Sequence, residues 1–370
     1  MKKASILSFQ FADNYGALLQ IYALQSILEK NNLEVNVLNF RPYELEQPYS
    51  VGINFKKSFH LDGAISTMKR IIAKTLTFNR NYKRRKSFNQ FRQNYLNLTE
   101  ESIYSYQDLN KKLPKFDYYF VGSDQVWNPD FFKFSEKAYF LDFAPVSSKK
   151  IAYACSIANS VEDDKYKKVF KEELPKFDSI SVRESSAKDL LSSLTSENIE
   201  VTLDPTLLLN QEEWGEVITS KIETEPYILV YDLQKSEAII NVANKLAIEK
   251  NLRIISYSES KEFVNHEYSF SSDGPEKFLS LFKNATFVIT SSFHGTVFSV
   301  IFEKEFLTVP HSSRGSRMID LLNLIGLESR IVYDENFQVD NINKIEFAEV
   351  SGKLDILRND SIKYIVEAIK

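Results

Sequence analysis

The segment from Phe287 to Pro310, FVITSSFHGTVFSVIFEKEFLTVP, constrains the fold of this chain more than any other part of the sequence. An apolar run breaks at a polar turn, helix-compatible residues follow, and a second apolar run ends the segment, which predicts strand, turn, helix and strand. In open α/β sheets, ligands bind beyond the carboxyl ends of the strands, where helix-start amides favour an anion. His294 stands in this turn and is the first catalytic candidate; the alternative is a histidine that only caps or packs at a helix start.

The same rhythm of strand and helix recurs in two blocks. One block runs from the N-terminus to about residue 205, and the rhythm restarts at Tyr227 after a charged passage. We therefore expect an α/β protein with two Rossmann-like domains facing each other across a cleft. The expected domains are residues 1–210 and 211–370, and the last helical segment, 360–369, is a candidate for packing back on the N-terminal domain.

Composition excludes several classes of protein. The 370 residues are enough for about two domains, and the formal charge of -4 gives no general attraction to nucleic acid. A single cysteine, Cys155, rules out an internal disulfide and a cysteine-based zinc site, and no spacing of histidines and carboxylates resembles a metal site. The N-terminal apolar run is too short for a signal peptide, and no run is long enough to span a membrane, so we expect a cytoplasmic protein.

Two further polar turns follow predicted strands near the start and middle of the first domain. The first, Asp13 to Gly16, contains Asn14 but lacks the G-x-G-x-x-G pattern of a dinucleotide site. The second follows Val121 and combines a permissive glycine with small polar groups and Trp127. An indole ring beside such groups is typical of sugar recognition, although a capped turn with a buried tryptophan has the same sequence.

A third turn places Arg183 directly after a strand. A guanidinium at this position can hold a phosphate or a carboxylate through two hydrogen bonds. The alternative is an ordinary neighbourhood of surface ion pairs with Glu184.

The segment of about residues 56–95 interrupts the rhythm. Between Lys56 and Arg92 it is rich in lysine and arginine, carries interleaved aromatic residues and has one acid, Asp62, which predicts a basic helical insertion in the N-terminal domain. Such a surface can lie on an anionic membrane. It can equally be a solvated helical hairpin whose aromatic residues pack on their own domain.

Several stretches, taken in order, resemble the polysaccharide pyruvyltransferase family from about residue 10 to residue 330. The stretches are NYGALLQIYAL, FVGSDQVWNP, SVRESSAKDLL, VTLDPTLLL, SSFHGTVFSVIFEKEF and SRGSRMIDLLNLIGL. The resemblance implies a fold like that of GT-B glycosyltransferases and transfer of a pyruvyl group from phosphoenolpyruvate to a sugar of a bacterial surface polysaccharide or its lipid-linked precursor, forming a pyruvate ketal. It implies no cofactor and no metal. A polyprenyl-linked acceptor would bring the enzyme to the inner face of the cell membrane as a peripheral protein.

The resemblance also assigns residues. The family's substrate-binding arginine corresponds to Arg183, and its Arg-(Leu or Phe)-His motif corresponds to residues 292–294, where the histidine matches but Ser292 replaces the arginine. Arg314 and Arg317 are candidates to supply the missing cation, although Arg317 can instead pair with a nearby acid.

Ketal formation needs two acid/base groups, one to protonate C3 of the donor and one to take a hydroxyl proton. His294 suits one role, and Asp124 or Glu184 suits the other. The residues expected to bind substrates are Arg183, Ser291, Ser292, Gly295, Arg314, Arg317, Asn14, Ser123, Gln125, Trp127 and Asn128.

Two other functions fit the same sequence features. A GT-B glycosyltransferase that uses a nucleotide sugar would share the architecture and would bind that sugar in place of phosphoenolpyruvate. A non-catalytic glycan-binding protein would bind glycans without turnover and would tolerate replacement of His294.

Overall fold

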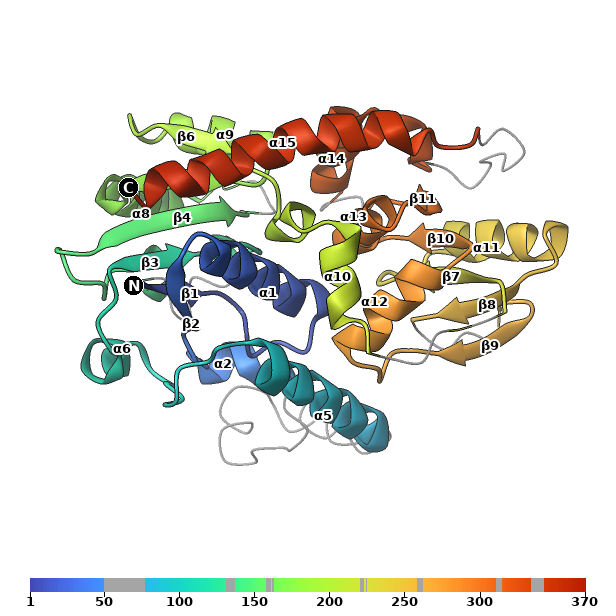
Figure 1. The fold of residues 1–370 in the computed structure, drawn as a ribbon, viewed down its shortest axis with the longest axis horizontal. Helices are drawn as coiled ribbons and strands as arrows, with labels where there is room; N and C mark the ends of the chain where they lie inside the picture. Colours follow the sequence, from blue (N-terminus) through green and yellow to red (C-terminus); the bar gives the residue numbers. More distant parts are fainter. Residues whose placement is uncertain are drawn as a thin grey trace.

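The fold is described from a computed structural model, which covers residues 1–49, 77–130, 137–157, 161, 163–219, 223, 225–257, 262–310, 315–333 and 343–370. The architecture is α/β, with two Rossmann-like domains that each contain a parallel sheet (Figure 1). Every strand pairing in both sheets is parallel, so the carboxyl ends of the strands in a sheet meet at one edge.

The N-terminal sheet has six strands in the order β2-β1-β3-β4-β5-β6. The chain winds outward in one direction from β1 and in the other from β3, so the topological switch point lies between these two strands. The strands are β1 (Lys2–Leu7), β2 (Leu33–Val37), β3 (Tyr118–Val121), β4 (Lys149–Cys155), β5 (Ser179–Val182) and β6 (Ile199–Val201).

The C-terminal sheet has five strands in the order β11-β10-β7-β8-β9, and its switch point lies between β7 and β10. The strands are β7 (Tyr227–Tyr231), β8 (Arg253–Ser256), β9 (His266–Ser269), β10 (Phe287–Thr290) and β11 (Glu305–Thr308). The expected domain limit near residue 210 falls between the two sheets and stays a prediction.

Helices connect the strands and cover the sheets. The α-helices are α1 (Tyr15–Lys30), α2 (Tyr43–Glu46), α5 (Phe78–Tyr95), α6 (Tyr106–Lys112), α8 (Asp164–Glu173), α9 (Ser185–Ser192), α10 (Gln211–Val217), α11 (Glu237–Glu249), α12 (Pro275–Asn284), α13 (Phe293–Ile301), α14 (Ser316–Ile325) and α15 (Phe347–Ala368). The 3-10 helices are η1 (Gln47–Tyr49), η2 (Ala138–Phe140), η3 (Leu174–Lys176), η4 (Pro205–Leu208) and η5 (Glu328–Arg330).

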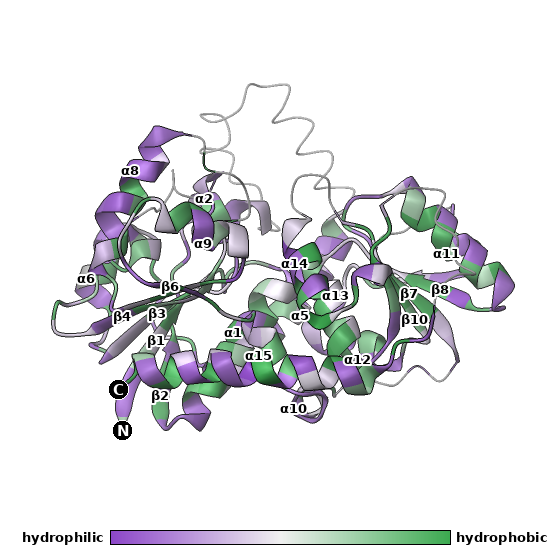
Figure 2. Cartoon of the chain, turned by 90° about the horizontal axis from the view of Figure 1, so that it is seen from above, coloured by the Kyte–Doolittle hydropathy of each residue, from purple (hydrophilic) through white to green (hydrophobic). Residues whose placement is uncertain are grey.

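The last helix, α15, lies across both domains (Figure 1). The hydroxyl of Tyr364 donates to the carbonyl of Ala152 in β4 at 2.9 Å, and the backbone N–H of Leu203 donates to Ser361 at 3.0 Å. In Figure 2, α15 alternates hydrophobic and hydrophilic residues, as expected of a helix with one face on a core and one face in water.

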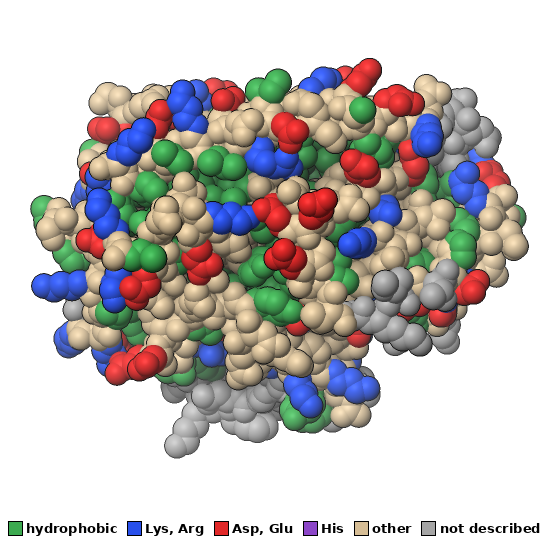
Figure 3. Space-filling model, in the orientation of Figure 1, with side chains coloured by type: hydrophobic (Ala, Val, Ile, Leu, Met, Phe, Trp, Pro, Cys, Tyr) green, Lys and Arg blue, Asp and Glu red, His purple; other side chains and the backbone are tan. Residues whose placement is uncertain are grey.

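One apolar core joins the domains. It contains residues of both sheets together with residues of α1, α12, α13 and α15, for example Ile6, Leu18, Phe278, Val288 and Ile365. On the face shown in Figure 3, basic and acidic side chains are interspersed. The described residues contain no helix that is long and apolar enough to cross a membrane.

Candidate functional site

Both switch points face the same region between the domains, and His294 lies there. It stands in the first turn of α13, directly after β10, with Ser292 as the N-cap residue. The opposite wall is the start of α1, because a side-chain carbon added at Gly16 would lie only 2.0 Å from Nδ1 of His294. Only glycine therefore allows α1 to approach the imidazole so closely.

Asp204 lies at the centre of the site and is fully buried. Its carboxylate accepts a hydrogen bond from Nη1 of Arg183 at 2.6 Å and one from the hydroxyl of Ser123 at 3.2 Å, and it lies 3.7 Å from Nε2 of His294. Burial alone raises the pKa of Asp204, but His294 and Arg183 outweigh burial and hold this pKa well below its usual range. Asp204 is thus a permanent anion that links His294 of the C-terminal domain to Arg183 of the N-terminal domain.

A second ion cluster adjoins the first. Glu184 lies with Oε1 3.9 Å from Nε of Arg183 and 3.8 Å from Nε of Arg317, and it accepts a hydrogen bond from the hydroxyl of Ser156. Both guanidinium groups lie over the ring of Phe293, at 4.6 Å for Arg183 and 5.8 Å for Arg317. Burial and the charge of Arg183 lower the pKa of Arg317 to about 10, so Arg317 stays positively charged at neutral pH.

Several polar atoms of this cluster are buried without a hydrogen-bond partner among the described residues. They are Nε and Nη2 of Arg183, Nε of Arg317, Oε2 of Glu184 and Nε2 of His294. A buried polar group that lacks a partner costs roughly 1–3 kcal/mol, and more when it is charged. Such a concentration of unpaired donors indicates a place for a polar ligand, and the two guanidinium groups favour an anion.

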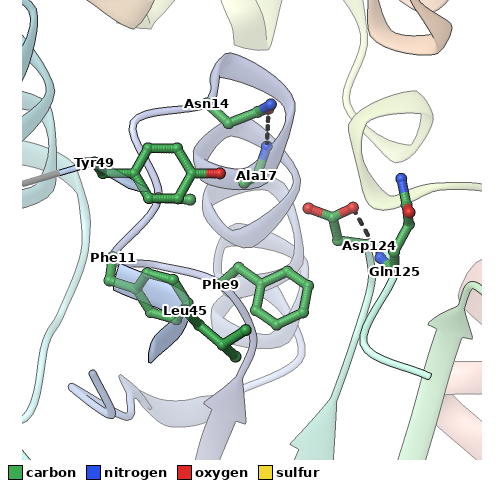
Figure 4. A pocket seen from close by; sticks show the side chains of 9 residues that line it. Phe9, Phe11, Asn14, Ala17, Leu45, Tyr49, Asp124 and Gln125 are labelled. Carbon is green, nitrogen blue, oxygen red and sulfur yellow. Dashed lines mark hydrogen bonds between the residues drawn. The ribbon is translucent and has the colours of Figure 1, made fainter. Parts of the chain in front are cut away.

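An open cavity of about 240 Å³ lies at the switch point of the N-terminal sheet (Figure 4). It lies between the segment that follows β1 and the turn that follows β3, and aromatic side chains form much of its wall. The lining residues are Phe9, Phe11, Ala12, Asn14, Ala17, Leu45, Tyr49, Asp124 and Gln125.

Some residues predicted to bind substrate have structural roles instead. Trp127 was expected to offer a ring face to a sugar, but it is fully buried, donates to the carbonyl of Tyr139 at 3.0 Å and stacks on Phe140. That expectation is wrong, because no face of the ring is open. Asn128 is also buried, and its side chain closes the same turn through bonds to Gln125 and Asp130.

The serine-rich turn after β10 is likewise internally bonded. The hydroxyl of Ser291 donates to Asp232 at 2.7 Å, and Gly295 packs so closely on Thr290 that a side-chain carbon would lie 2.1 Å from its hydroxyl. The backbone N–H of Ser292 donates to the hydroxyl of Thr290. Arg314 lies outside the described residues.

The structure thus brings His294, Arg183, Glu184 and Arg317 together, and it adds Asp204. Asp204 stands in the segment VTLDPTLLL, but the sequence alone predicted no role for it. The available signal was an aspartate directly after a predicted strand, the same signal that singled out Arg183. No group of three or more histidine, cysteine, aspartate or glutamate side chains that could hold a metal occurs among the residues whose placement is described.

Comparison with known proteins provides a family. The family model for polysaccharide pyruvyl transferases matches residues 14–313, which is most of the chain. No curated protein matches the sequence.

Solved structures resemble the fold. A Listeria monocytogenes protein described as a UDP-N-acetylglucosamine 2-epimerase superposes with a TM-score of 0.50 at 10% identity, over 98% of this chain and 90% of that chain. The 2-epimerase of Neisseria meningitidis gives a TM-score of 0.49 at 9% identity, over 100% and 99% of the two chains. At such identities the first likeness shows the fold alone, and it agrees with the GT-B-like arrangement of two Rossmann-like domains.

Proposed function

This chain belongs to the polysaccharide pyruvyl transferase family, and we propose that it transfers a pyruvyl group from phosphoenolpyruvate to a sugar of a bacterial surface polysaccharide or its lipid-linked precursor, forming a pyruvate ketal. The observation that carries this proposal is the buried pair Arg183 and Arg317, whose guanidinium groups have unpaired nitrogens and lie over the ring of Phe293, the residue before His294. Phosphoenolpyruvate carries a carboxylate and a phosphate, and these two anionic groups match two guanidinium groups.

The surroundings of the two arginines favour a small anion. Asp204 and Glu184 offset part of the positive charge, which keeps both guanidinium groups in place before the donor binds. The N-terminus of α13 adds positive potential at the same place, because its first backbone N–H groups have no partner within the helix. Ser292, which replaces the family's arginine, leaves Arg317 as the second cation of the donor site.

The reaction requires two proton transfers. One acceptor hydroxyl attacks C2 of the donor while C3 gains a proton; the bond from C2 to the phosphate oxygen then breaks, and a second hydroxyl closes the ketal. Of the two hydroxyl protons, one is retained at C3 and one leaves with the phosphate. We assign proton delivery to C3 to His294 and removal of the hydroxyl proton to Asp124, with Glu184 as the alternative for that second role.

Location at the inner face of the membrane belongs to the same proposal. A polyprenyl-linked acceptor lies in the bilayer surface, and α5 presents exposed Phe78 and Tyr82 beside exposed basic residues. Aromatic and basic side chains together are typical of helices that lie on anionic membranes.

The direct test is incubation with phosphoenolpyruvate and a panel of lipid-linked or nitrophenyl glycosides. We expect release of phosphate together with a mass gain on the sugar. Phosphoenolpyruvate without any nucleotide should also raise the melting temperature, because a ligand that binds only the native state stabilises it. Stabilisation by UDP-sugars but not by phosphoenolpyruvate would overturn the proposal in favour of a glycosyltransferase.

Arg317→Ala tests the donor site. Loss of a charge-assisted contact worth about 1.5–3 kcal/mol should lower kcat/KM for phosphoenolpyruvate roughly 10- to 150-fold and leave the acceptor KM nearly unchanged. Arg253→Ala is the control, because Arg253 begins β8 and pairs with Glu223 and Glu267 at the edge of the C-terminal sheet. A wild-type dependence on phosphoenolpyruvate in Arg317→Ala would assign Arg317 to the fold alone.

A further inference from the structure

The cavity between β1 and β3 is a candidate binding site of its own. Its aromatic wall is continuous, because the ring centroids of Phe9 and Phe11 lie 5.9 Å apart and those of Phe11 and Tyr49 lie 6.5 Å apart. The segment that contains Phe9 and Phe11 is fixed by α5, since the carbonyl of Phe11 accepts hydrogen bonds from Arg85 at 2.9 Å and from Arg92 at 3.0 Å. The rings are inclined to one another, at 61° for Phe9 and Phe11 and at 58° for Phe11 and Tyr49, so they form an angled apolar wall that is preorganised before a ligand binds.

The cavity adjoins the proposed donor site along two routes. Along one, the carbonyl of Asp124 accepts from the backbone N–H of Ser156 at 2.9 Å, and the hydroxyl of Ser156 donates to Glu184. Along the other, Asn14 caps α1 through Ala17, and Gly16 between them packs directly on the imidazole of His294. The cavity is therefore lined by Asp124, one of the two groups assigned to proton transfer, and by Asn14 and Ala17 of the helix start that packs on the other, His294.

The charge of the cavity is negative. Among the described residues that line it, Asp124 alone carries a charge. One oxygen of Asp124 accepts from the backbone N–H of Gln125 at 2.8 Å, and the other oxygen points toward the cavity (Figure 4). Burial, and then the charges of Asp124 and Asp13, raise the pKa of Tyr49 to about 12, so its hydroxyl stays neutral and can donate a hydrogen bond.

We infer that this cavity is the acceptor site and that it selects an uncharged pyranose over a uronic acid or a phosphorylated sugar. The inference rests on the proposed function. The ring of Tyr49 packs on the apolar face of the sugar, and the two phenylalanine rings, which are inclined to it, bound the cavity. Asp124 accepts a hydrogen bond from the attacking hydroxyl and then its proton, while its negative charge repels an anionic substituent on the sugar.

Equilibrium binding separates this inference from the catalytic step. The probes are methyl glucoside, methyl galactoside and methyl mannoside with their uronic acid counterparts, measured by calorimetry without phosphoenolpyruvate so that no turnover occurs. We expect the neutral glycosides to bind more tightly than the uronates. Asp124→Asn should reduce that preference about tenfold by binding the uronates better. Asparagine is the suitable replacement, because the backbone of Asp124 has φ 68° and asparagine tolerates this left-handed conformation.

The aromatic wall has its own variants. Tyr49→Ala should weaken binding of the neutral glycosides roughly 5- to 10-fold, and Tyr49→Phe should retain most of the affinity, since ring stacking carries the interaction. Tyr104→Ala, at an exposed tyrosine outside the cavity lining, is the matched control and should bind like the wild type.

The outcomes distinguish the two proposals. If phosphoenolpyruvate stabilises every variant and phosphate is released, but Tyr49→Ala and Asp124→Asn bind glycosides and uronates as the wild type does, the acceptor inference fails and the proposed function stands. If the glycoside pattern appears as expected but phosphoenolpyruvate neither binds nor is consumed, the cavity is a sugar site and the proposed function fails.

Discussion

At the candidate site, Asp204 lies within contact distance of residues from both domains. It is fully buried and joins Arg183 and Ser123 of one domain to His294 of the other. Asp204→Asn should lower the free energy of unfolding at neutral pH by about 3 kcal/mol, because the buried guanidinium of Arg183 loses the carboxylate that accepts its hydrogen bond. Turnover should fall as well, since the imidazole loses its charged neighbour.

The effect of Asp204 should depend on pH. An aspartate in an unfolded chain has a pKa of about 3.9, whereas that of folded Asp204 is lower, so the unfolded state binds the proton first as the pH falls. The stabilisation is therefore complete above about pH 5 and decreases below it. In urea titrations, the difference between wild type and Asp204→Asn should shrink from about pH 5 toward about pH 3; a constant difference would contradict this account.

At the residue scale, sequence patterns located polar side chains but not their partners. His294 and Arg183 were predicted because each stands in the turn that follows an apolar strand, and the structure places both beside the same carboxylate oxygen of Asp204. Trp127 was misassigned because the sequence of a sugar-binding turn and that of a buried, capped turn are the same. The packing of Phe140 and Phe170 against the indole shows that the buried, capped turn is present.

At the scale of elements, α5 holds the segment after β1 in place through hydrogen bonds. Arg92 donates to the carbonyls of Gln10, Phe11 and Ala12 and to the carboxylate of Asp13. Arg92→Ala should therefore lower the free energy of unfolding by about 3–5 kcal/mol. Lys86→Ala is the control on the exposed side of the same helix and should change it by about 0.5 kcal/mol at most. Equal stability of the two variants in urea would show that the hydrogen bonds of Arg92 do not contribute to the free energy of unfolding.

The other side of α5 is available for a membrane. Arg80, Lys83 and Lys86 are exposed, and the rings of Phe78 and Tyr82 stack with centroids 6.2 Å apart. With about 1 kcal/mol for each basic residue, replacing all three by glutamine should weaken sedimentation with anionic vesicles roughly 100-fold and leave turnover of a soluble acceptor unchanged. Neutral vesicles are the control. Equal sedimentation of wild type and variant at low salt would remove the membrane role.

Helices and strands whose apolar residues recur at a regular spacing were predictable from the sequence, and others were not. The strand, turn, helix and strand predicted over Phe287 to Pro310 agree with β10, α13 and β11. The edge strand β9, which begins at His266, is not predictable in this way, because its polar residues lack an alternating pattern. The prediction of only residues 360–369 for the last helix was too short, because the first half of α15 also carries an apolar stripe, Phe347, Val350, Leu354 and Leu357, that packs on the core. The basic residues of 56–76 lie outside the described residues.

At the scale of the whole molecule, one apolar core spans the two domains in addition to a core within each, and this predicts how the protein unfolds. Proteins with two domains often unfold in separate steps, but here a single apolar cluster includes residues of both sheets and of α15. The stacking of Tyr15 in α1 on Phe278 in α12, with centroids 4.2 Å apart, is one of its direct links. Opening the interface would expose this apolar surface to water, so neither domain is expected to remain folded alone.

The two tryptophans report separately on this prediction. Trp127 lies in the N-terminal domain against Phe140, whereas Trp214 lies between the domains, with its ring 5.6 Å from Tyr22 of α1 and 5.2 Å from Phe298 of α13. Trp214→Phe therefore leaves a probe of the N-terminal core, and Trp127→Phe leaves a probe of the interface. In each variant the fluorescence and circular dichroism transitions in urea should coincide, as expected for a single cooperative unit. If the fluorescence of Trp214 changes at a lower urea concentration than the circular dichroism of the same variant, the interface opens before the domains unfold, and the shared core does not couple them.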